Sequence, residues 1–213
     1  MQLAIFGSTG RVGRLLAEQA LAAGHAMTAF ARTPDALPTG VRAHPRVRVV
    51  VGNAEEAARV SDAVAGADAV VSTVGHTKTS RPDVLAAFAG VLLPAMREAG
   101  VARLVSLVGA GVADPKDERS LGQTVVRGVM RLVTRAMLED AEAHARLVRA
   151  SDRAWTLVRP PRLTDDPPTG RVRAGYFAAG PGDRITRGDL AAWMLAQAGS
   201  EEWVREAPVV ANA

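Results

Sequence analysis

The chain has 213 residues, of which 48% are hydrophobic and 23% charged, the composition of an ordinary globular protein long enough for one domain with its own core. It has no cysteine and four scattered histidines, which excludes thiol chemistry and thiolate metal sites and argues against a structural metal. The net charge of +4 is spread along the chain among acidic residues, so the basic stripe expected of a nucleic-acid-binding protein is missing.

The sequence shows no recognisable targeting signal or membrane-spanning segment. No basic region precedes the apolar run at the N-terminus, and the longest apolar stretch, Val84 to Met96, is too short to span a bilayer. We therefore expect a cytoplasmic protein, a monomer or homodimer, that binds a small molecule rather than a membrane.

Residues 2–13 read Gln-Leu-Ala-Ile-Phe-Gly-Ser-Thr-Gly-Arg-Val-Gly, an apolar run followed by three glycines spaced three apart. The run suits a strand buried on both faces of a parallel sheet. Gly7 permits the turn, Gly10 lets main-chain amides approach an anion, and Gly13 lets the next helix pack closely. An ordinary tight turn is the alternative. The residues predicted to surround a pyrophosphate are Gly7, Ser8, Thr9, Gly10, Arg11, Val12 and Gly13.

The next two elements bear on the choice of cofactor. A helix is predicted from Val12 to Ala23 with Gly24 as its cap, and a strand from Ala26 to Ala31. Arg32 follows that strand, where a carboxylate would hold the ribose of NAD and an arginine would accommodate the 2′-phosphate of NADP. We therefore expect NADP(H) to be favoured over NAD(H), unless Arg32 is simply a solvated residue.

A third strand followed by a helix is predicted next. We expect a surface loop from Pro34 to Pro45, a strand from Arg46 to Val51, and a short helix from Ala54 to Ala65 capped by Gly66. Asn53, after the strand, would lie beside the adenine; a purely turn-forming role for Asn53 is equally open.

Three further strands should end at the same edge of the sheet. They are expected at Asp68 to Val74, Leu104 to Val108 and Trp155 to Arg159. Ligands of open parallel sheets bind outside the carboxyl ends of the strands. Gly75 permits close approach there, and His76 could titrate or donate a proton near the reaction centre, although it could equally be a solvated loop residue.

Two helices are predicted between these strands. From Val84, apolar residues recur at helical spacing up to Gly100, with a kink expected at Pro94. A loop is expected from Asp114 to Ser120, then a long helix from Leu121 to Ala150. Its predicted apolar side holds Val125, Val129, Leu132, Val133 and Met137. Its basic row, a solvated face or else an oligomer or anion surface, holds Arg127, Arg131 and Arg135.

The C-terminal part has weaker signals. A turn-rich loop is expected from Thr164 to Gly170, an added strand from Arg171 to Phe177, and an amphipathic helix after Ile185–Asp189. A last edge strand is expected from Glu206 to Ala211. The chain therefore reads as one α/β Rossmann-like domain, a doubly wound and mainly parallel sheet with helices on both faces, with a small substrate-side part from about 160 to 213.

These landmarks together resemble a known family. Gly-Ser-Thr-Gly-Arg-Val-Gly, the Arg32 strand end, Thr73-Val74-Gly75 and Val158-Arg159-Pro160-Pro161 are similar to the atypical short-chain dehydrogenase/reductase group. Within it the likeness is to the NAD(P)H-binding family of flavin reductase (biliverdin reductase B) and NmrA-like redox sensors. The resemblance implies NADP across the carboxyl ends of the strands. Its expected contacts beyond the glycine turn are Arg32, Asn53, Ala54, Val74, Gly75, His76, Val108, Gly109, Pro160, Pro161 and Arg162.

The departures from the family concern acid/base chemistry. Short-chain dehydrogenases usually carry a Tyr and a Lys four residues apart, whereas this chain has one tyrosine, Tyr176, and two lysines, Lys78 and Lys116, in no such arrangement. Where flavin reductases have a serine and a histidine, this chain has Gly109 and Arg162. Arg162 and His76 remain as catalytic candidates. Two functions follow: an NADPH-dependent reductase of a planar acceptor such as a flavin or quinone, or a non-catalytic NADP(H) sensor.

Overall fold

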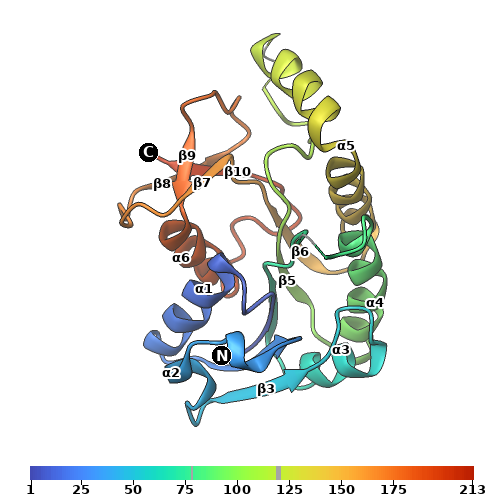
Figure 1. Cartoon of the computed structure of the whole chain (residues 1–213), viewed down its shortest axis with the longest axis vertical. Coiled ribbons are helices and arrows are strands. Elements are labelled where there is room, and N and C mark those ends of the chain that lie inside the picture. Colours follow the sequence, from blue (N-terminus) through green and yellow to red (C-terminus); the bar gives the residue numbers. More distant parts are fainter. Residues whose placement is uncertain (78, 119–120) are drawn as a thin grey trace.

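The fold is built on a six-stranded parallel sheet, seen in a computed structural model that describes residues 1–77, 79–118 and 121–213, the backbone only for 121–134. The strand order is β3-β2-β1-β4-β5-β6 (Figure 1). Successive strands are therefore added outward on one side from β1 to β3, and on the other side from β4 to β6. This is the Rossmann-like, doubly wound arrangement that the sequence predicted. The strands are β1 (Gln2–Phe6), β2 (Ala26–Ala31), β3 (Val47–Val51), β4 (Ala69–Ser72), β5 (Arg103–Leu107) and β6 (Ala154–Val158).

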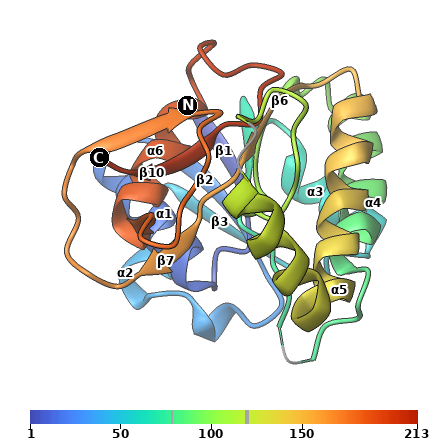
Figure 2. The same cartoon turned by 90° about the horizontal axis from the view of Figure 1, so that it is seen from above.

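Helices cover both faces of the sheet, as both views show (Figures 1 and 2). Successive side chains of β1 alternate between the two cores, Leu3 and Ile5 on one side, Ala4 and Phe6 on the other. The core that contains Leu3 and Ile5 is covered by α1 (Arg11–Ala22) and α6 (Arg187–Gln197). The core that contains Ala4 and Phe6 is covered by α3 (Ala57–Val64), α4 (Val84–Glu98) and α5 (Leu121–Ala150).

The glycines that the sequence placed at helix ends adopt the conformation expected there. Gly24, Gly66 and Gly100 have φ angles of +85°, +73° and +71°, in the left-handed region that only glycine enters freely. The helix predicted from Val84 continues past Pro94, and the kink expected at that proline stays a prediction.

Two predictions for the segment from Pro34 to Ala65 need correction. The segment from Pro34 to Pro45 is not a plain loop, because it forms a 3₁₀ turn, η1 (Pro34–Ala36), and a single helical turn, α2 (Thr39–Arg42), which bury Leu37 and Val41. The helix predicted from Ala54 starts at Ala57, because Asn53 and Glu56 first form a turn of their own.

The long helix α5 has the bounds predicted from the absence of proline, Leu121–Ala150. Most of its predicted apolar side and two of its three predicted basic residues lie outside the residues whose side chains the structure describes: Val125, Val129, Leu132, Val133, Arg127 and Arg131. Arg135 pairs with Glu139 one turn later, as on a solvated face, and Met137 is 48% exposed.

The C-terminal part forms two small sheets beside the main one. β7 (Arg162–Thr164) pairs in parallel with β9 (Arg184–Thr186), and neither strand was predicted. β8 (Val172–Gly175) is the expected added strand in a shorter form. β10 (Val209–Asn212), the later part of the expected edge strand, pairs antiparallel with β8. The same segment also lies along β6, because Glu206 and Val209 form isolated parallel bridges with Thr156 and Arg159.

Candidate functional site

The turn after β1 leaves no room for side chains. Gly7 has a φ of +77°, and a Cβ there would lie 2.7 Å from the carbonyl carbon of Thr73. A Cβ on Gly13 would lie 2.1 Å from the Gly7 carbonyl oxygen, to which Gly10 donates a 2.9 Å hydrogen bond. The turn predicted at Gly7 and the close packing predicted at Gly13 are therefore present.

The N-terminus of α1 offers free main-chain donors. Its N-cap is Gly10, which has no side chain to cap the helix, and the first helical bond runs from Arg14 N–H to Gly10 O. The N–H groups of Arg11, Val12 and Gly13 consequently have no acceptor within the helix. Donors at the positive end of a helix dipole, beside a turn without side chains, fit a pyrophosphate.

Two side chains of this turn are already engaged. The buried Ser8 hydroxyl donates to the carbonyl oxygen of Phe30 at 2.8 Å, so it fixes the turn against β2 rather than pointing a donor outward. Arg11 pairs with Asp165, which also accepts from Arg187 at 2.8 Å. Arg11 must release Asp165, or share its donors, to reach a phosphate oxygen.

The predicted adenosine end lies at the ends of β2 and β3. Arg32 is exposed there and forms no hydrogen bond or ion pair with any residue that the structure describes. Asn53 is also exposed, and its N–H donates to the Glu56 carboxylate at 3.0 Å. Ala54 packs against the core on the α4 side. In this arrangement the Asn53 side-chain amide is available to contact a ligand.

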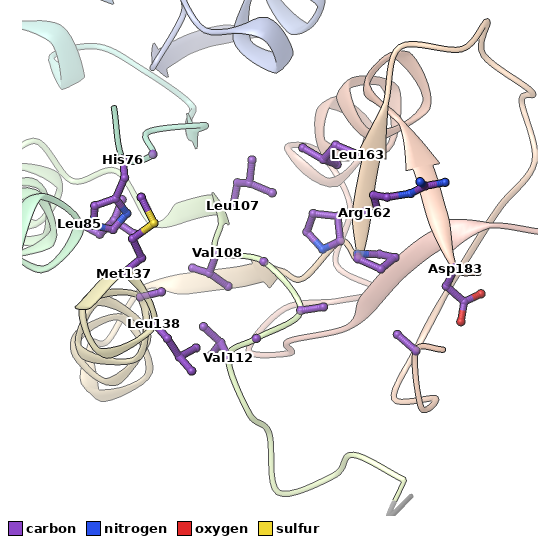
Figure 3. Close-up of a pocket in the computed structure, with 18 of the residues that line it drawn as sticks. His76, Leu85, Leu107, Val108, Val112, Met137, Leu138, Arg162, Leu163 and Asp183 are labelled. Atoms are coloured by element: carbon purple, nitrogen blue, oxygen red, sulfur yellow. The ribbon is translucent and has the colours of Figure 1, made fainter. Parts of the chain in front are cut away.

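A cavity of about 800 Å³ lies at the carboxyl ends of β4, β5 and β6 (Figure 3). Its walls are mostly aliphatic side chains and glycines, among them Leu85, Leu107, Val112 and Leu163. Thr73 links it to the glycine turn, because its hydroxyl is bonded to the carbonyl oxygens of Phe6 and Gly7. The predicted cofactor contacts that line the cavity are Val74, Gly75, His76, Val108, Gly109, Pro160, Pro161 and Arg162.

The two catalytic candidates lie on opposite walls of this cavity. His76 stands beside Leu85 and Met137, whereas Arg162 lies on β7 with its guanidinium extended toward β9, away from the centre of the cavity (Figure 3). The His76 Nε2 is 2.9 Å from Asp140 Oδ2, in a pair whose side chains are 11% and 2% exposed. His76 is thus a fixed, partly buried group, and the solvated-loop alternative is wrong in that respect.

The contribution of α5 to the site was not predicted from the sequence. Asp140 contacts His76, and Met137, Leu138 and Ala141 line the cavity. A signal was present, since Asp140 and His144 are four residues apart in a stretch where the buried Ala141, Ala145 and Val148 recur at helical spacing. Polar residues on a buried helix stripe indicate a specific partner.

A serine–histidine pair lies deeper, outside the cavity. Ser106 Oγ is 2.9 Å from His144 Nε2, and His144 Nδ1 is 3.0 Å from the Leu85 carbonyl oxygen. Because a carbonyl only accepts, Nδ1 carries the hydrogen and Ser106 donates to Nε2. Burial lowers the pKa of His144, against a backbone hydrogen bond and the nearby Asp140, which raise it. Neither side chain lines the cavity, so the pair is structural.

The segment after β5 forms ion pairs with the residue that follows β6 and with the C-terminal part. The fully buried Arg159 binds Asp117 through two hydrogen bonds of 2.9 and 2.6 Å, and Lys116 binds Glu206 at 2.5 Å. Tyr176 also bonds to Glu206, and burial and that bond raise its pKa. Tyr176 and Lys116 therefore meet one carboxylate, but neither lines the cavity, so they do not replace the dehydrogenase Tyr–Lys pair.

Comparison with known proteins decides the family. A family model described as NAD(P)H-binding matches residues 7–201, from the first glycine of the turn to beyond α6. The chain belongs to the NAD(P)H-binding family. The resemblance to the atypical short-chain dehydrogenase/reductase group predicted from the sequence is thereby confirmed.

Solved structures show that this NAD(P)H-binding protein shares its whole fold with others. The anaerobilin reductase ChuY from Escherichia coli O157:H7 is 19% identical, with a TM-score of 0.81 over 99% of this chain and 96% of that one. A short-chain dehydrogenase/reductase from Veillonella parvula in complex with NADP is 16% identical (TM-score 0.78; 98% and 93%). The oxidoreductase ylbE from Lactococcus lactis is 21% identical (TM-score 0.79; 100% and 91%).

The described part of this NAD(P)H-binding protein offers neither a cluster of metal ligands nor a helix suited to a bilayer. Within residues 1–77, 79–118 and 121–213, no group of three or more His, Cys, Asp or Glu side chains could hold a metal ion. None of the helices described combines the length and apolar character that crossing a bilayer requires.

Proposed function

We propose that the protein is an NADPH-dependent oxidoreductase that passes hydride to a planar acceptor such as a flavin or quinone. The observation that carries the proposal is the apolar cavity of about 800 Å³ that adjoins the glycine turn through Thr73. A cavity of this size accommodates a nicotinamide ring and a second flat molecule, with few polar groups to fix the orientation.

The residues at hand fit a dinucleotide. The free N–H groups of Arg11, Val12 and Gly13 would hold the pyrophosphate, and Arg32 would bind the 2′-phosphate of NADP(H). Gly75, Gly109 and Pro161 would surround the nicotinamide. The bound nicotinamide would supply the hydride; the protein would bind, orient and exclude water. A structural relative described as a complex with NADP supports this cofactor.

The acceptor would be bound by the C-terminal part, from about residue 160 onward. Leu163 and Pro181 give it an apolar wall, and Arg162 would bind or polarise a carbonyl or carboxylate of the acceptor. A conjugated acceptor needs little more than positioning beside the nicotinamide. A structural neighbour is described as an anaerobilin reductase, and this description supports a reductase that acts on a small molecule.

One observation favours a second function. Among the residues that the structure describes, the cavity has no Tyr–Lys pair, because the single tyrosine of the chain, Tyr176, is bonded to Glu206 elsewhere. A protein that binds NADP(H) without turning it over, and reports the redox state to a partner, would need no such pair.

Turnover separates the two functions. Purified protein is mixed with NADPH and a panel of flavins and quinones, and the loss of absorbance at the reduced nicotinamide band is followed. Oxidation above the rate without protein supports the reductase. Saturable NADPH binding with no oxidation by any acceptor contradicts the reductase and supports the sensor.

A further inference from the structure

The imidazole of His76 is held by two oxygen atoms at the cavity wall. Its Nε2 lies 2.9 Å from Asp140 Oδ2 and 3.2 Å from the carbonyl oxygen of Pro82. Because a carbonyl and a carboxylate face the same nitrogen, that nitrogen must carry a hydrogen. The other nitrogen, Nδ1, makes no hydrogen bond with the part of the chain that the structure describes. Nδ1 is therefore the atom that can exchange a proton with a molecule in the cavity.

Asp140 is itself fixed from the other side. Its two carboxylate oxygens accept the N–H groups of Leu85 and Ala86 at 2.9 Å each, at the N-terminus of α4. These donors and the positive end of the helix dipole compensate the buried charge. His144, one turn further along α5, is bonded to the Leu85 carbonyl oxygen. The start of α4 thus fixes the carboxylate, and the carboxylate fixes the His76 ring.

We propose that His76 delivers the proton that completes reduction of the acceptor, and that Asp140 is the residue that positions it. This inference rests on the proposed reductase function. Imidazole exchanges protons near neutral pH, whereas the guanidinium of Arg162, the other candidate, does not release one. A Tyr–Lys pair would then be unnecessary.

The proton balance is simple. A bound reduced nicotinamide would supply the hydride, and the reduced acceptor would then carry one negative charge on a conjugated oxygen or nitrogen. The Nδ1–H bond of the His76 imidazolium breaks as the new O–H or N–H bond forms on the acceptor. The ring is left neutral with its hydrogen on Nε2, the form that the two oxygens stabilise, and takes its next proton from water.

The charged groups around the ring are identified from the elements that surround it. α5 contributes Asp140 and His144, and the segment that leads into α4 contributes Arg81 and Asp83, which pair with each other. Asp140 is the one of these four that contacts His76. A change confined to Asp140 therefore tests the positioning of the ring.

The first readout needs no cofactor. In protein labelled with ¹⁵N in its histidines, the His76 ring signals are assigned by their loss in His76→Gln. We expect a Nε2–H proton protected from exchange in the unmodified chain and exposed in Asp140→Asn, with native stability checked by urea unfolding. A Nε2 without hydrogen, or equal protection in Asp140→Asn, would overturn the role of Asp140.

The second readout is turnover with an acceptor found active. We expect His76→Gln to lower kcat about 100-fold and Asp140→Asn to lower it less, whereas His25→Gln, beside the N-terminal amino group, should leave it unchanged. Unchanged kcat in His76→Gln would overturn this inference and leave the reductase standing. Absence of turnover in the unmodified protein would overturn both.

Discussion

Gly13 illustrates how a single missing methyl group shapes the proposed phosphate site. A Cβ at this position would lie 2.1 Å from the Gly7 carbonyl oxygen, closer than any real contact, and the obstacle is backbone that cannot swing aside. We expect Gly13→Ala to push α1 away from the turn and to weaken NADPH and NADH binding equally, as measured by calorimetry.

Gly90→Ala is the matched control for that variant. Gly90 lies in the middle of α4 with open space where a Cβ would go, so alanine should be tolerated and could raise helix stability by up to about 1 kcal/mol. Undiminished nucleotide binding by Gly13→Ala would show that the turn is not the phosphate site.

Arg32 is the residue on which the proposed preference for NADP(H) depends. It is exposed at the end of β2 with no carboxylate partner among the residues described, so its charge is available to a 2′-phosphate. We expect Arg32→Ala to weaken NADPH binding by about 1 to 3 kcal/mol and to leave NADH nearly unchanged. Arg97→Ala, at the far end of α4, should affect neither. Equal losses for both cofactors with Arg32→Ala would refute the assignment.

At the scale of elements, the start of α6 depends on one buried carboxylate. Thr186 caps the helix by accepting from Asp189 N–H, and Asp189 in turn accepts from the N–H groups of Thr169 and Gly170 and from Asn212. Burial raises the pKa of Asp189, but these hydrogen bonds outweigh it and lower the pKa to about 2. Asp189 therefore joins the β7–β8 loop, α6 and β10.

This cluster should contribute to acid sensitivity. A carboxyl whose folded pKa is depressed stabilises the protein above its unfolded pKa, about 3.9, and loses that contribution as the pH falls toward 2. We expect the free energy of unfolding to drop by on the order of 2 kcal/mol more between pH 4 and pH 2 than in Asp189→Asn, measured by urea unfolding. Parallel pH profiles for the two proteins would contradict this role.

The elements that the sequence predicted well are those with strong local signals. The six main strands are short, largely apolar segments, and the glycines after α1, α3 and α4 adopt positive φ, so both kinds of feature could be predicted from local sequence. β7 and β9 are three-residue strands that exist only because they pair with each other, and no local pattern indicates them. Asp140 was missed for a similar reason, since its partner His76 lies on another element.

At the scale of the whole molecule, the site is assembled along one edge of the sheet. The glycine turn, Arg32 and the cavity follow β1, β2 and β4 to β6, so each part was predictable from a strand end. The outer wall of the cavity was not, because α5 and the segment from Ala179 to Asp183 reach it through tertiary packing alone. The proposed cofactor side of the site was therefore more predictable from the sequence than the proposed acceptor side.

The central claim is that main-chain amides at the start of α1 hold the pyrophosphate of NADP(H). It is tested most directly by titrating ¹⁵N-labelled protein with NADP⁺ and following the amide signals. We predict saturable shifts that are largest for Arg11, Val12 and Gly13, with Gly66 and Gly100, at the opposite edge of the sheet, unmoved. Saturable binding that leaves the amides of residues 11–13 unchanged would contradict the claim, as would no binding at all.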